Sequence, residues 1–185
     1  MSYVDSIMTG TDAEIMPLLV EFYGGGDPIL DCTFGMGRFW AHEKPKNLVT
    51  LDITTRADIV GTYDRLPFKD QVIGTIVFDP PHMRVSSGRV YLMYQPPTKA
   101  PDFTLFLGEA KRILRIGGVV IAKMADELMV RPWNHVKFIT GAEEVGLEPF
   151  DLIVRSRHLS IRNTAHPQYR ARRKHCFYVI LKKKK

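Results

Sequence analysis

The sequence has 185 residues, of which 45% are hydrophobic and 25% charged, and its formal net charge is +6. This length and composition favour one globular domain, residues 1–185, with a complete core and no large second domain. Two cysteines are too few for a disulfide framework, and no stretch matches a signal peptide or a membrane span, so we expect a reduced, soluble, cytoplasmic protein.

Positive charge is concentrated toward the end of the sequence. From Leu152 onward there are eleven Lys or Arg residues and no Asp or Glu, whereas residues 1–151 carry fifteen basic and twenty acidic residues. An excess of one sign favours a polyanionic partner, and the alternative is a solvated hairpin. The basic segment, residues 155–174, is the part expected to bind nucleic acid, through Arg155, Arg157, Arg162, Arg170, Arg172, Arg173 and Lys174.

The first third of the chain has the order of a nucleotide-binding unit. A helix is expected over residues 12–23, because Thr11 and Glu14 form a capping-box pattern and three glycines follow the last helical residue. Strands are expected over residues 28–31 and 48–52, with a glycine loop and a helix between them and Asp52 at the end. A lone Gly-x-Gly is often a plain turn, but this whole order is typical of a βαβ site.

An apolar strand over residues 73–78 ends in Asp79-Pro80-Pro81-His82. A continuous apolar run suits a strand covered on both faces of a parallel sheet, and proline ends it because it cannot donate a ladder hydrogen bond. Asp79 is therefore expected at the carboxyl end of a buried strand, where open α/β sheets bind ligands. A rigid strand exit is the purely structural alternative.

The remaining elements alternate between strand and helix. They are expected at residues 59–60 (strand), 103–114 (helix, closed by Gly117 and Gly118), 119–122 (strand), 133–145 (helix, ended by Gly146), 150–154 (strand) and 177–181 (strand). Residues 83–102 are expected to form a loop insertion. The fold predicted is α/β, with a mostly parallel seven-stranded sheet whose last strand is antiparallel.

Taken together, these motifs resemble the class I S-adenosylmethionine-dependent methyltransferases, and among them the amino-methyltransferases that act on nucleic-acid bases. The resemblance covers nearly the whole chain and implies a Rossmann-like methyltransferase domain. It implies that S-adenosyl-L-methionine is bound by the glycine loop, by an acid for the ribose hydroxyls at Asp52 and by an acid near the adenine at Asp64. The cofactor-binding residues implied are Asp31, Phe34, Gly35, Gly37, Asp52 and Asp64.

Asp79-Pro80-Pro81-His82 resembles the catalytic signature of these enzymes, in which an acid or amide and two prolines precede Tyr, Phe or Trp. The resemblance implies that these four residues are catalytic and that the reaction is N-methylation of an exocyclic base amine, adenine being the first expectation. His82 departs from the pattern, because an imidazole offers a smaller face for stacking on the target base.

Several alternatives remain open at this point. The substrate is RNA or DNA, or else a small molecule or a protein side chain, and a catalytically silent nucleic-acid-binding subunit is a further alternative. A protein partner or a homodimer is compatible with the small size. No metal site is expected, because the histidines and cysteines lack paired ligand spacings, and Cys32 is interpreted as a buried structural thiol.

Overall fold

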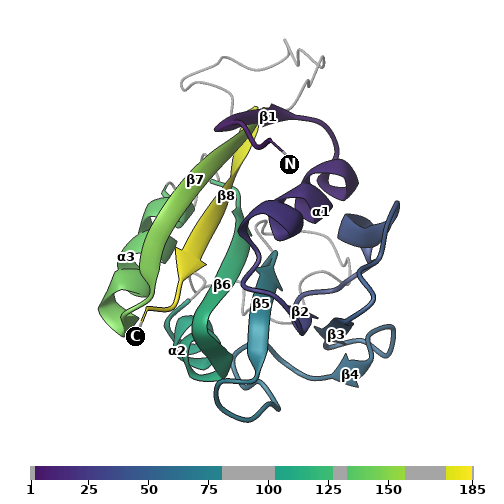
Figure 1. Cartoon of the computed structure of the whole chain (residues 1–185), viewed down its shortest axis with the longest axis vertical. Coiled ribbons are helices and arrows are strands. Elements are labelled where there is room, and N and C mark those ends of the chain that lie inside the picture. The colour runs from purple at the N-terminus through teal and green to yellow at the C-terminus, as the bar shows by residue number, and fades with distance from the viewer. Residues whose placement is uncertain (1–2, 81–102, 127–132, 157–173, 185) are drawn as a thin grey trace, which may run out of the picture.

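Eight strands form one sheet in the order β1-β7-β8-β6-β5-β2-β3-β4 (Figure 1). The structure, a computed structural model, describes residues 3–80, 103–126, 133–156 and 174–184. The strands are β1 (Ile7–Thr9), β2 (Ile29–Asp31), β3 (Leu48–Asp52), β4 (Ile59–Val60), β5 (Ile73–Phe78), β6 (Leu114–Met124), β7 (Glu148–Ser156) and β8 (His175–Lys182). Among these described strands β8 alone is antiparallel to its neighbours, β6 and β7. The predicted α/β fold with an antiparallel last strand is confirmed.

β1 is the strand that the sequence analysis did not predict. It has only three residues, and Ile7 is 66% exposed. It pairs in parallel with the end of β7, where Ile7 lies opposite Val154. Backbone pairing at the sheet edge holds this strand, so no hydrophobic alternation marks it in the sequence.

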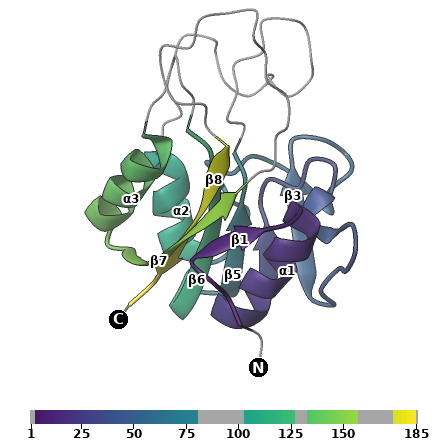
Figure 2. The ribbon, with the colours of Figure 1, turned by 90° about the horizontal axis from the view of Figure 1, so that it is seen from above.

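Helices cover both faces of the sheet (Figure 2). One face packs against α1 (Asp12–Tyr23), which contributes Ile15, Met16 and Leu19 to a core cluster. The other face packs against α2 (Thr104–Ile113) and α3 (Asn134–Val145). In the described residues, no helix is both long and apolar enough to cross a membrane.

β5 is buried along its whole length, as its apolar sequence predicts. All six residues from Ile73 to Phe78 are buried. Val77 faces the α1 cluster, whereas Ile76 and Phe78 face the cluster that contains α2 and α3. Phe78 stacks on Phe106 of α2 with ring centroids 3.6 Å apart. A strand fixed this firmly on both faces delivers Asp79 to a defined position at its carboxyl end.

The helix expected between β2 and β3 is replaced by a single 3₁₀ turn, η1 (Arg38–Trp40). Only seven residues separate this turn from β3, and Pro45 lies among them. Proline cannot donate a helical hydrogen bond, and it disfavours helical geometry in the residue before it, so the segment cannot extend as a helix. The buried rings of Phe39 and Trp40 pack into the α1 cluster instead.

Gly117 and Gly118 do not close α2, contrary to expectation. The helix ends at Ile113 and passes directly into β6, so both glycines lie inside a strand. A Cβ on Gly118 would lie 3.0 Å from the carbonyl oxygen of Gly74 in β5, and one on Gly25 would lie 2.7 Å from the Cα of Gly118. Close backbone packing, and not a helix cap, explains Gly118. α3, in contrast, ends at Gly146 with φ of 82°, as predicted.

Candidate active site

The loop after β2 is tied to the two strands beside it. Cys32 donates its backbone N–H to the carbonyl of Val77 in β5 at 3.2 Å, and Phe34 donates to Leu51 in β3 at 3.2 Å. The Cys32 thiol also donates to Val77 and is buried, and burial raises its pKa well above the ordinary value. Cys32 is therefore a structural thiol and not a thiolate nucleophile.

Both loop glycines adopt left-handed backbone geometry. The φ angles of Gly35 and Gly37 are 56° and 67°. A Cβ on Gly37 would also lie 2.8 Å from the ring of Phe34, whereas one on Gly35 would approach nothing closer than 3.8 Å. The positive φ angle therefore requires glycine at both positions, and at Gly37 the nearby ring of Phe34 also leaves no room for a side chain. The loop follows β2 at the carboxyl edge of the sheet, the place where a ligand can approach the backbone.

Asp52 joins this loop to the end of β3. Its Oδ2 accepts the backbone N–H of Gly35 at 2.8 Å, and its Oδ1 accepts that of Thr54 at 3.0 Å. Each carboxylate oxygen has two acceptor positions, so Asp52 has further capacity for hydroxyl donors. Ile53 and Met36 lie next to these residues in sequence and are 40% and 55% exposed, which adds apolar surface near the acid.

Asp31 lies almost completely buried at the end of β2, with 1% exposed. Its carboxylate accepts hydrogen bonds from the indole of Trp40 at 2.8 Å and from the backbone of Thr33 at 3.1 Å. Burial, aided by the nearby charges of Asp79 and Asp52, raises the pKa of Asp31 to about 7 despite those bonds. The carboxyl groups of Asp31, Asp52 and Asp79 therefore lie close enough at this edge of the sheet to interact electrostatically.

Asp79 is fixed to the glycine loop through its backbone. Its N–H donates to the hydroxyl of Thr33 at 2.7 Å, and its side chain is 26% exposed. The loop after β2 and the exit of β5 thus form one unit, in which Asp79 lies within electrostatic reach of Asp31. Pro80 is buried.

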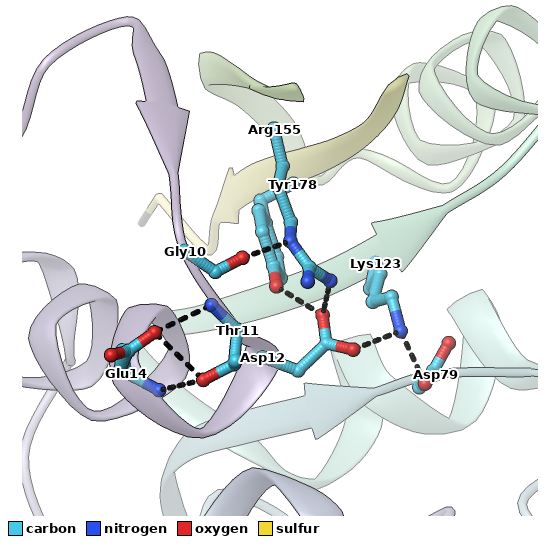
Figure 3. A network of polar contacts seen from close by, with 8 residues as sticks. All are labelled: Gly10, Thr11, Asp12, Glu14, Asp79, Lys123, Arg155 and Tyr178. Carbon is cyan, nitrogen blue, oxygen red and sulfur yellow. Dashed lines mark hydrogen bonds and ion pairs between the residues drawn. The ribbon is translucent and has the colours of Figure 1, made fainter. Parts of the chain in front are cut away.

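The Asp79 carboxylate also belongs to a network that the sequence analysis missed (Figure 3). Lys123, in β6, donates to Asp79 Oδ2 at 3.1 Å and to Asp12 Oδ2 at 3.1 Å. The residue is 7% exposed. One signal was visible in the sequence: a lysine interrupts the apolar run of residues 119–124. A charged residue in a buried strand requires a partner, and Asp79 is one of the two.

Asp12, in the first turn of α1, anchors the far side of this network. Its Oδ1 accepts the hydroxyl of Tyr178 at 2.7 Å and pairs with the guanidinium of Arg155. Burial alone would raise the pKa of Asp12, but the ammonium of Lys123 and the hydrogen bond from Tyr178 outweigh it and lower the pKa. Burial and the Asp12 charge raise the pKa of Tyr178, so its hydroxyl remains a donor.

Arg155, which the sequence analysis grouped with the nucleic-acid-binding residues, points inward. Its Nε donates to the carbonyl of Gly10 at 2.9 Å, and its side chain is 12% exposed. The positive charge of Arg155 is therefore paired with Asp12 within the protein. Lys174, at the other end of the basic segment, is exposed.

The remaining candidate residues are only partly described. Phe34 is partly buried against the α1 cluster, and Asp64 follows β4 and accepts a hydrogen bond from the hydroxyl of Thr62. The other expected site residues, which are Pro81, His82, Arg157, Arg162, Arg170, Arg172 and Arg173, lie outside the described residues, as do residues 83–102.

Comparison with known proteins gives a likeness in structure. No family model and no curated protein matches the sequence. A methyltransferase from Thermotoga maritima described as S-adenosylmethionine-dependent superposes with a TM-score of 0.58 and 18% identity, over 95% of this chain and 88% of that one. The 1,6-didemethyltoxoflavin-N1-methyltransferase of Burkholderia thailandensis holds bound 1,6-didemethyltoxoflavin and S-adenosylhomocysteine. It superposes with a TM-score of 0.57 and 13% identity, over 94% of this chain and 77% of that one.

A candidate DNA modification methylase from Thermus thermophilus, in complex with S-adenosyl-L-methionine, aligns with 14% identity and a TM-score of 0.47. The alignment covers 64% of this chain, which spans about half of that protein, 51% of its length. The Thermotoga and Burkholderia proteins each superpose over more than nine tenths of this chain, and both are methyltransferases. The described elements of this chain thus have the Rossmann-like fold of the S-adenosylmethionine-dependent methyltransferases.

Proposed function

We propose that this protein transfers a methyl group from S-adenosylmethionine to an exocyclic amine of a nucleic-acid base, with Asp79 as the residue that holds the amine. The observation that carries the proposal is the position of Asp79. It leaves a fully buried strand, it is tied by its backbone to Thr33 of the glycine loop, and its carboxylate is partly exposed at the carboxyl edge of the sheet.

The residues of the glycine loop fit the cofactor. S-adenosylmethionine, when bound, supplies an electrophilic methyl on a cationic sulfur, and the carbon–sulfur bond breaks with its electron pair left on sulfur. The carboxylate of Asp52, which is bonded to Gly35 of the loop, favours that positive charge over a neutral molecule. Asp52 has acceptor capacity for a pair of ribose hydroxyls, and the geometry of Gly35 and Gly37 keeps side chains off the loop backbone.

Asp79 needs no strong basicity for this role. An aryl amine is a poor nucleophile because its lone pair is delocalised into the ring. The Asp79 carboxylate and the Pro80 carbonyl, held together by the rigid chain at the motif, can each accept one N–H of the amine. Such bonds favour a pyramidal nitrogen whose lone pair forms the new N–C bond. The alkylated nitrogen is acidic and then releases one proton to solvent.

A base inside a duplex cannot reach a site at the end of a buried strand, so the target is flipped out or already single-stranded. The cost of exposing the base is lowest for unpaired RNA or DNA. The basic segment supports a nucleic-acid substrate, since it has six basic residues besides Arg155 and no acid.

Methylation of a small molecule is the second candidate. The similar Burkholderia enzyme is named for the methylation of 1,6-didemethyltoxoflavin, and its likeness covers 94% of this chain. In this case the basic segment would have no part in the reaction.

Incubation with methyl-radiolabelled S-adenosylmethionine and either total RNA or total DNA, followed by nucleoside analysis, tests the proposal. We expect label in one N-methylated nucleoside, with N6-methyladenosine or its deoxy form as the first candidate. Cofactor binding without label in any nucleoside would reject the nucleic-acid function and leave the small-molecule enzyme or the silent subunit.

A further inference from the structure

We propose that Lys123 is a positioning residue of this site, which sets the orientation of the Asp79 carboxylate by clamping it to Asp12 of α1. The inference rests on the proposed function, because it assigns Lys123 a role through Asp79. The network that carries it runs from Tyr178 and Arg155 through Asp12 and Lys123 to Asp79 (Figure 3).

The placement of Lys123 follows from the sheet register. Phe78 lies opposite Ala122 in the parallel pairing of β5 with β6, so the next residues, Asp79 and Lys123, come level at the carboxyl edge. On its other side Lys123 lies opposite Tyr178 of β8. The lysine is thus fixed by two neighbouring strands.

The ammonium of Lys123 connects three separate elements. It lies 3.1 Å from a carboxylate oxygen of Asp79 after β5, 3.1 Å from one of Asp12 in α1, and 5.3 Å from the ring centroid of Phe39 in η1. η1 follows directly on the glycine loop. Lys123 therefore contacts the turn that follows the glycine loop, the first helix and the carboxylate of Asp79.

Asp12 makes this connection rigid. Its Oδ2 accepts a hydrogen bond from the ammonium of Lys123, and its Oδ1 interacts with Tyr178 and Arg155. Both carboxylate oxygens therefore have fixed partners. The backbone next to it is also fixed, because Thr11 and Glu14 form a capping box and Arg155 donates to Gly10. An ammonium tied to such an anchor restrains the Asp79 side chain to one orientation.

The orientation of Asp79 matters because the reaction depends on alignment. A misplacement of about 1 Å in a reacting group can lower a rate about 100-fold. A buried ion pair is weak evidence for stability, since well-packed apolar residues often replace one without loss. In this network Asp79 is held by a lysine and, through it, by a second acid, an arginine and a tyrosine, and positioning of Asp79 explains such an arrangement better than stability does.

The test uses the full chain, with total RNA or total DNA as acceptor and methyl-radiolabelled S-adenosylmethionine. Lys123→Met keeps the side-chain length and removes the charge. We expect it to lower the single-turnover rate by about 10- to 100-fold while the cofactor Kd changes less than about twofold. Lys123→Arg, which keeps the charge, should retain more activity. Lys183→Met is the matched control, because Lys183 bonds to Lys111 and Leu114 at the opposite edge of the sheet.

A double variant separates positioning from a general structural role. If Lys123 acts through Asp79, then Asp79→Ala with Lys123→Met should be no slower than Asp79→Ala alone. Rate losses that multiply in the double variant would overturn the inference. If Lys123→Met does not fold, Asp12→Asn tests the same inference. A reduced single-turnover rate with an unchanged cofactor Kd would support the positioning role of Lys123, and a rate equal to that of the unmodified protein would refute it.

The outcomes also separate this inference from the proposed function. Full activity in Asp79→Ala, or no transfer to RNA or DNA by the unmodified protein, would reject the proposed function and the clamp with it. An inactive Asp79→Ala combined with a fully active Lys123→Met would leave the function standing and reject the clamp alone.

Discussion

Asp52 is the residue whose proposed cofactor role can be tested most simply. Asp52→Ala removes the acceptors proposed for the ribose hydroxyls and also leaves the N–H of Gly35 without its partner. We expect S-adenosylmethionine binding to weaken by ~1–3 kcal/mol, measured by calorimetry. Asp58→Ala is a suitable control, because Asp58 accepts bonds from Thr50 of the same strand, β3, whereas Gly35 of the loop bonds to Asp52. Equal affinity in Asp52→Ala and the unmodified protein would remove Asp52 from the site.

The buried Asp31 carboxyl predicts a pH dependence of stability. Its pKa is raised to about 7 in the folded chain, chiefly by burial, whereas an unfolded Asp titrates near 3.9. Between about pH 4 and 7 the folded chain retains a proton that the unfolded chain loses. This contribution to the unfolding free energy is therefore present at low pH and is lost as the pH rises through about 7.

Asp31→Asn should remove this dependence, because the amide does not titrate. Urea unfolding at pH 5, 6, 7 and 8 measures the difference between variant and unmodified protein. As the pH rises toward 7, the free energy of unfolding of the unmodified protein should fall, relative to that of the variant, by up to about 1.4 kcal/mol per pH unit. Above pH 7 the difference between the two should level off. Two curves that run parallel from pH 5 to 8 would show that Asp31 titrates normally.

At the scale of single residues, the sequence identified acids at strand ends better than it identified their partners. Asp31, Asp52 and Asp79 could be found because each ends an apolar strand, and the structure brings these three together. Lys123 and Asp12 could not be paired from the sequence, because 111 residues separate them and only the folded sheet makes them neighbours.

Among the elements, α1 has the most direct bearing on the site. Thr11 accepts the N–H of Glu14 at 3.3 Å, and Glu14 accepts the N–H of Thr11 at 2.6 Å, which completes the capping box. Thr11→Ala should lower the free energy of unfolding by ~0.5–2 kcal/mol in urea titrations. Thr11→Ser keeps the hydroxyl, so its free energy of unfolding should fall only slightly. An equal loss in both variants would indicate that the methyl group, and not the cap, provides the stability.

Elements with strong local signals were predicted nearly to the residue. The bounds of α1 and β5 match, because a capping box and a fully apolar run are local patterns. β1 has no such pattern, and the helix expected after the glycine loop was inferred from the usual order of a βαβ unit and not from its own residues. Pro45 and the short connection to β3 exclude a longer helix at this place.

At the scale of the whole molecule, charge asymmetry predicts a salt-dependent interaction. The basic segment has an excess of one sign, and Arg170, Arg172 and Arg173 are the variants of choice because Arg155 is already paired with Asp12. Replacing the three with alanine should weaken binding to a methylated RNA or DNA. It should also reduce the slope of log affinity against log salt by about 0.7–0.9 for each phosphate that is no longer neutralised.

Cofactor affinity is the internal control for this triple variant and should not change, since the substitutions remove no residue of the proposed cofactor site. An unaltered salt slope, measured on a nucleic acid that the protein methylates, would mean that the substrate enters elsewhere.

The most direct test of the whole account is single-turnover methyl transfer by Asp79→Ala, with saturating S-adenosylmethionine and the nucleic acid identified by nucleoside analysis. Asp70→Ala is the matched control, since this carboxylate is 70% exposed and pairs with Arg112. We expect the rate of Asp79→Ala to fall by about 10²- to 10³-fold, with cofactor affinity and folding retained. A rate equal to that of the unmodified protein would contradict the account, because Asp79 would then be a structural strand exit.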